Sequence, residues 1–132
     1  MRAKERRKIA ARKARQAETD KADADLLERG IDQAEIDIMP KRVRRVAAAM
    51  IIKELGFLQT MELDSDNAVP RKIRKIEAGV VAAIKHACKC MSACNDYSSD
   101  CFARSMYWYS TKRPETEKAC MGIALSFGFL PE

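Results

Sequence analysis

Residues 37–46 read DIMPKRVRRV, and residues 67–76 read NAVPRKIRKI. Position by position, both stretches hold an Asp or Asn, two apolar residues, a proline, two bases, a β-branched residue, two more bases and a second β-branched residue. Each stretch then enters a mainly apolar segment, at residues 47–52 and 78–84. The two copies predict two helices, each with a basic first turn and an apolar continuation that enters the core.

The residues that open the two copies are typical of helix starts. Asp37 and Asn67 are good N-cap residues, because their side-chain oxygens can accept a bond from an unpaired N–H group of the first turn. Pro40 and Pro70 then fall within that turn, where a missing N–H costs nothing. We therefore expect each helix to begin beside its Asp or Asn.

The bases of the two copies point to a bound anion. A helix N-terminus carries partial positive charge, so a Lys or Arg there costs about 0.3–1 kcal/mol, and a bound anion reverses that effect. The predicted phosphate-binding residues are Lys41, Arg42, Arg44 and Arg45 in the first copy, and Arg71, Lys72, Arg74 and Lys75 in the second. In the alternative interpretation these bases are a solvated face that pairs with nearby acids, namely Asp32, Glu35, Asp64 and Asp66.

Composition predicts an all-α fold. The chain has 132 residues, with only 5 glycines and 4 prolines, and it is rich in Ala, Lys, Arg and Met, which favour helices. We expect a compact bundle of four or five helices with a basic N-terminal helical arm. Residues 1–30 would form the arm, basic and then acidic, and residues 31–132 the bundle domain. The helices expected in the bundle cover residues 38–55, about 68–94, about 100–110, and a last segment that ends at Gly128.

The N-terminal segment is strongly basic. Residues 1–17 hold eight bases and one acid, whereas residues 18–37 are mainly acidic. Ile9 is the only sizeable apolar side chain of the first block, so a helix there has no face to bury. Blocks of like charge usually mark interaction tails, and a frayed terminus is the alternative. The residues of the arm predicted to bind nucleic acid are Arg6, Arg7, Arg12 and Arg15.

The charge of the whole chain indicates the class of partner. The net charge is +6 and the sequence pI is about 9.2, which favours an acidic partner. We expect non-catalytic binding of nucleic acid, either RNA or DNA, through its phosphates, within a larger nucleoprotein assembly that includes other protein subunits. The alternative is a protein–protein interaction module, such as a viral structural or adaptor subunit or a small inhibitor of a nucleic-acid enzyme.

Five cysteines allow three interpretations. A zinc site from His86, Cys90, Cys94 and Cys101 is conceivable, since the first three fall at a spacing of four on one helical face. The paired CxxC motifs of common zinc modules are absent, and cysteine usually packs as a small apolar residue. Buried free thiols are the interpretation that we favour over metal and over disulfides, so we expect no metal and no cofactor.

Other function classes find little support in the sequence. There is one histidine and no Walker A, GxGxxG or HExxH motif, so we do not expect an enzyme. No apolar run is long enough to span a bilayer, and no apolar segment follows the basic N-terminus as in a secretory signal. We expect an intracellular, reducing location and no membrane partner.

An aromatic cluster at residues 106–109 has two interpretations. It reads MYWY, with two bases shortly after it, and an exposed cluster of this kind could stack on single-stranded nucleic acid. Such clusters more often belong to a core, and we expect Met106 and Tyr109 to be buried.

Overall fold

The computed structural model describes the backbone of residues 2–61 and 68–129, and the side chains of residues 2–53, 74–114 and 116–129. All regular elements within these ranges are helical, which confirms the predicted all-α class. The elements are α1 (Ala3–Glu28), α2 (Gln33–Ile38), α3 (Lys41–Met61), α4 (Ala68–Cys94), α5 (Ser99–Lys112), the short 3-10 helix η2 (Pro114–Thr116) and α6 (Glu117–Ser126).

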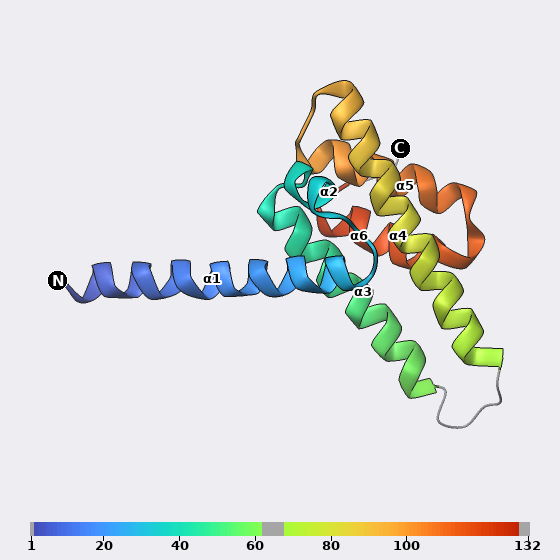
Figure 1. Cartoon of the computed structure of the whole chain (residues 1–132), viewed down its shortest axis with the longest axis horizontal. Helices are drawn as coiled ribbons and strands as arrows, with labels where there is room; N and C mark the ends of the chain where they lie inside the picture. Colours follow the sequence, from blue (N-terminus) through green and yellow to red (C-terminus); the bar gives the residue numbers. More distant parts are fainter. Residues whose placement is uncertain (1, 62–67, 130–132) are drawn as a thin grey trace.

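Helix α1 gives the molecule its elongated shape. Its N-terminal half projects away from the other helices, and its C-terminal half packs on α3 (Figure 1). Helices α3 and α4 follow each other in the chain and run in opposite directions, so their starts lie at opposite ends of the pair (Figure 1). Helices α5 and α6 pack on each other, and they contact α4 and α3 respectively.

The core collects one apolar stripe from each α-helix. Leu26, Ile36, Val43, Ile84 and Phe102 are fully buried, and Ile123 adds the stripe of α6. Burial of each such side chain contributes about 1.5–3 kcal/mol. The stripe of α1 lies in its second half, at Thr19, Ala22 and Leu26. The packed part of the chain therefore begins before residue 31, within the range that we expected to form the arm.

The start predicted for the first basic helix was wrong. Asp32, not Asp37, is the N-cap, and it opens the short helix α2: its carboxylate accepts a bond from the N–H of Glu35 at 2.9 Å, and the Glu35 carboxylate accepts one from the N–H of Asp32 at 3.1 Å. Asp37 lies inside α2. A residue that precedes proline is disfavoured in the α conformation, so α2 ends at Ile38 and α3 begins after Pro40.

Residues with positive φ follow the ends of α1 and α4, and α3 is longer than predicted. Gly30 has a φ of 95° and follows the end of α1, as a left-handed cap residue does. Helix α4 covers the predicted range, and Asn95 ends it with a φ of 51°. The predicted end of this helix at residue 55, before Gly56, was wrong, because α3 continues to Met61. A glycine costs about 1 kcal/mol in a helix interior, which weakens a helix without ending it.

Gly79 of α4 has a packing role. A Cβ built at this position would lie 2.1 Å from Cγ2 of Thr116, a residue of η2 that is buried. No side chain fits at such a distance. The absence of a Cβ at Gly79 is what lets η2 lie against α4, and this contact positions the connection between α5 and α6.

Candidate nucleic-acid interface

The buried stripe of α1 becomes basic where the helix leaves the bundle. Thr19, Ala22 and Leu26 face α3, at spacings of three and four. The same spacing continues toward the N-terminus through four bases that are all exposed, and these are Arg15, Arg12, Lys8 and Lys4. One face of α1 is therefore apolar against the bundle and basic beyond it. Lys4 and Lys8 were not among the predicted binding residues, and they extend this basic face toward the N-terminus.

A basic groove lies where the two parts of this stripe meet. It has a volume of about 430 Å³, and its walls come from α1 and the start of α3. The lining residues are Arg12, Arg15, Gln16 and Thr19 of α1, and Lys41 and Arg45 of α3. None of these described lining residues is acidic. The fold thus brings together four of the predicted phosphate-binding residues, two from the arm and two from the first repeated stretch.

Hydrogen bonds fix the wall of the groove. The guanidinium of Arg45 donates from Nη1 to Oγ1 of Thr19 at 2.9 Å, and this hydroxyl donates to the backbone carbonyl of Arg15, also at 2.9 Å. Thr19 is 1% exposed, so the bonds are shielded from water. A guanidinium has five N–H donors, and one bond to Thr19 leaves capacity for a phosphate. Across the groove, Nζ of Lys41 lies 3.5 Å from Oε1 of Gln16.

The electrostatics of the groove favour an anion. Four cationic side chains share one concave surface, and Lys41 is also the first residue of α3, where the helix dipole is positive. Like charges at close range repel each other, and the repulsion falls when an anion is bound between them. Arginine guanidinium groups match phosphate oxygens with paired donors. The four cations of the groove therefore suit an anion of the size of a phosphate group.

Two other bases of the first copy have structural contacts. Arg44 donates from Nε to the carbonyl of Met39 at 2.8 Å, and its Nη1 lies 3.4 Å from Oδ2 of Asp23 on α1. Its side chain is only 15% exposed. The Arg42 guanidinium lies 5.4 Å from the ring centroid of Phe127, a cation–π contact. The contacts of Arg44 join α3 to α1, and Arg44 does not line the basic groove.

The second basic copy lies on a different part of the molecule. The side chains of Arg71 and Lys72 fall outside the described residues, while Arg74 and Lys75 are exposed on α4. Because α3 and α4 are antiparallel, the start of α4 lies far from the groove at the start of α3 (Figure 1). The two copies share a sequence pattern, but the fold does not bring them to one surface.

The acids named in the alternative interpretation are engaged elsewhere where the structure describes them. Glu35 pairs with Lys85 of α4 at 2.6 Å, and this hydrogen bond raises the pKa of Lys85. Asp32 caps α2. Asp64 and Asp66 lie outside the described residues. Among the described bases of the two repeated stretches, Arg44 forms an ion pair with Asp23 of α1. Neither interpretation predicted this pair.

The cysteines do not form a metal site in the described part of the chain. All five are free, and no three His, Cys, Asp or Glu side chains of the described residues are grouped so as to hold a metal ion. Cys88 and Cys120 are buried, and burial raises their pKa to about 12 and about 11 respectively. Cys94 is exposed, so the expectation that the thiols are buried was wrong for this residue. Sγ of Cys90 lies 3.5 Å from Nε2 of His86.

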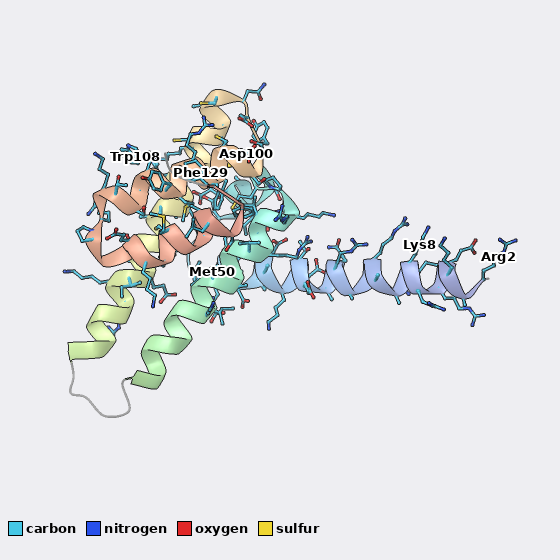
Figure 2. The ribbon with its side chains drawn as sticks, turned by 180° about the vertical axis from the view of Figure 1, so that it is seen from behind. Arg2, Lys8, Met50, Asp100, Trp108 and Phe129 are labelled. Atoms are coloured by element: carbon cyan, nitrogen blue, oxygen red, sulfur yellow. The ribbon has the colours of Figure 1, made fainter. Side chains whose placement is uncertain are left out.

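The aromatic cluster is divided between core and surface. Met106 is fully buried, as predicted, and Tyr109 is half-buried against the core. Trp108 is 49% exposed and stacks on the ring of His86, with 5.2 Å between ring centroids. Lys112 lies 5.8 Å from the centre of the indole ring. Figure 2 shows Trp108 on the bundle, far from Arg2 and Lys8 on the projecting arm.

Comparison with known proteins found no family model, no curated protein and no solved structure that matches this chain. Within the described residues, no helix has both the length and the apolar character that crossing a membrane requires.

Proposed function

We propose that this protein binds nucleic acid through the phosphate backbone, without catalysis, as part of a larger nucleoprotein assembly. The observation that carries the proposal is the groove formed by Arg12, Arg15, Lys41 and Arg45, which continues into the exposed basic half of α1. A single phosphate would fill only the groove. The basic stripe beyond it calls for a ligand with phosphates at regular intervals, which a nucleic acid provides.

The proposal predicts how binding depends on salt. Each phosphate neutralised by a Lys or Arg releases condensed counterions, so log affinity falls with log salt by about 0.9 per contact for a duplex and about 0.7 for a single strand. Residues 2–15 carry eight bases against Glu5. Together with Lys41 and Arg45, they supply enough cations for a steep salt dependence.

The decisive experiment removes three cations of the groove. In the variant Arg12→Gln, Arg15→Gln, Lys41→Gln, the slope of log affinity for a duplex against log salt should become shallower by about 2.7, three contacts at 0.9 each. The measurement is fluorescence anisotropy with a labelled polynucleotide between about 50 and 200 mM salt. All three side chains are exposed, so stability should change by less than about 0.5 kcal/mol.

A matched control separates the groove from overall charge. The variant Lys89→Gln, Arg104→Gln, Arg113→Gln removes the same number of exposed cations from the bundle, and it should keep the wild-type slope. Equal losses in both variants would mean that net charge, not the groove, drives binding. If the wild type binds no polynucleotide even at low salt, the proposal fails.

A second candidate function is a protein–protein interaction module, and a groove between α3 and α6 favours it. This groove has a volume of about 620 Å³ and is lined by Met50, Pro114, Met121 and Leu125, among others. Leu125 is 48% exposed. If two copies associate through this groove, light scattering will show a concentration-dependent dimer that Leu125→Glu dissociates. A monomer at every concentration would remove this version of the candidate.

A further inference from the structure

We propose that the nucleic acid is double-stranded B-form DNA, and that the projecting half of α1 lies in its major groove. This inference rests on the proposed function and names its ligand. It is carried by three features of α1: the distribution of bases around the helix, the size of the helix, and the position of the basic groove at its base.

The bases of the arm lie on more than one face. Lys4, Lys8, Arg12 and Arg15 form the stripe that continues the buried face of α1. Arg2, Arg6 and Lys13 are separated by four and seven residues, so they share a second face, and they are exposed as well. A helix that lies on one backbone strand needs cations on one face only. Cations on two faces suit a site with a phosphate strand on either side.

The major groove of B-form DNA is a site of this kind, and its size fits. An α-helix with its side chains is about 10–12 Å across, and this groove is about 12 Å wide. One side of the helix between the two basic faces holds Ala3, Ala10, Ala14 and Ala17 together with Arg7, so it is slim except at Arg7. In contrast, the major groove of A-form RNA is deep and narrow, and side chains do not reach into it.

The length of the arm sets the extent of the contact. The 14 residues of the segment 2–15 span about 21 Å at 1.5 Å each, which corresponds to about six base pairs at 3.4 Å. Figure 2 shows Arg2 and Lys8 on this projecting segment, clear of the bundle. The groove at Arg12, Arg15, Lys41 and Arg45 lies where the segment meets the bundle. It would hold the phosphate strand at the edge of the major groove and so fix the orientation of the arm.

Binding should also increase the order of the arm. Lys4, Lys8 and Arg12 are separated by four residues each, and like charges at this spacing destabilise an exposed helix. Phosphates on both sides would remove that repulsion. We therefore expect the helical content measured by circular dichroism to rise when duplex DNA is added.

The test compares three polynucleotides of one sequence: duplex DNA, duplex RNA and single-stranded DNA. Anisotropy titrations should show about tenfold tighter binding to duplex DNA than to duplex RNA or single-stranded DNA, about 1.4 kcal/mol. Bound protein should protect guanine N7, which lies in the major groove, from dimethyl sulfate. The protected stretch should extend over about six base pairs. Duplex RNA that binds as tightly, or unprotected N7, would overturn the inference.

Two matched double variants test both faces of the arm. Lys4→Gln, Lys8→Gln changes the first face, and Arg2→Gln, Lys13→Gln changes the second. A helix between two strands should lose about two contacts in either variant, so both salt slopes should become shallower by about 1.8. If only the first variant has an effect, the arm lies on one strand and this inference is wrong while the proposed function stands. If no polynucleotide binds, the proposed function itself has failed.

Discussion

Arg44 and Arg12 should respond in opposite ways to the same substitution. Arg44→Gln removes two contacts of a mostly buried guanidinium, one with the carbonyl of Met39 and one with the carboxylate of Asp23. Arg12→Gln changes an exposed side chain at the edge of the basic groove. We expect Arg44→Gln to cost stability and Arg12→Gln to cost binding.

The magnitude for Arg44→Gln follows from its contacts. A hydrogen bond to a charged group contributes about 1.5–3 kcal/mol, and loss of Arg44 also leaves Asp23 partly buried without its cation. The Asp23 side chain is 23% exposed, so water compensates part of this loss. We expect the free energy of unfolding to fall by about 2–4 kcal/mol. For a chain of this size, the melting temperature should fall by roughly 10 °C.

Urea unfolding and polynucleotide binding should be measured on the same two variants. Arg44→Gln should keep the wild-type salt slope at temperatures where it is folded, whereas Arg12→Gln should make the slope shallower by about 0.9 with stability unchanged within about 0.5 kcal/mol. The assignment of Arg44 would be refuted if its variant were as stable as the wild type and lost as much binding as Arg12→Gln.

Four further predictions use other parts of the structure. Gly79→Ala should lower the free energy of unfolding by about 1–3 kcal/mol, and adding Thr116→Ser, which removes the clashing methyl group, should restore part of it in urea titrations. The free energy of unfolding should fall as pH rises above 9.0, the pKa of Cys88 in the unfolded chain, because the folded pKa is about 12 and only the unfolded chain ionises in this range. Cys88→Ala should flatten this fall. A wild-type curve that stays flat from pH 9 to 11 would contradict the prediction. Iodoacetamide should label Cys94 quickly and Cys88 only after unfolding, as followed by mass spectrometry. Deleting residues 1–11 should leave the melting temperature nearly unchanged, since these residues are all exposed where described, and should weaken binding; a large loss of stability would show that the arm is packed.

Local signals account for the parts of the fold that the sequence predicts well. Helix α4 could be placed because an apolar stripe of spacing three and four runs along it and Asn95 ends it. The start of α3 was misplaced because Asp32 and Asp37 are both good N-cap residues. The Glu three residues after Asp32 favours the first, and Pro40 prevents the helix from continuing through Met39. Both signals are present in the sequence, and they are stronger than the resemblance between the two basic copies.

The candidate site depends on a contact between α1 and α3 that local patterns do not contain. Neighbouring residues of a helix point about 100° apart, so Arg44 and Arg45 face different partners although they are adjacent in the chain. Which base faces the groove depends on the rotation of α3, and burial of Val43, Ala47 and Ile51 fixes that rotation.

The same reasoning applies to α1. Because Thr19, Ala22 and Leu26 are buried against the bundle, the bases that continue their stripe must lie along the same side of the helix. Arg12 and Arg15 then meet the start of α3, and Lys4 and Lys8 extend the surface beyond the bundle. The apolar half of the stripe thus determines where the basic half points. A change of net charge alone would leave this direction intact, whereas a change in the apolar residues would move the whole basic surface.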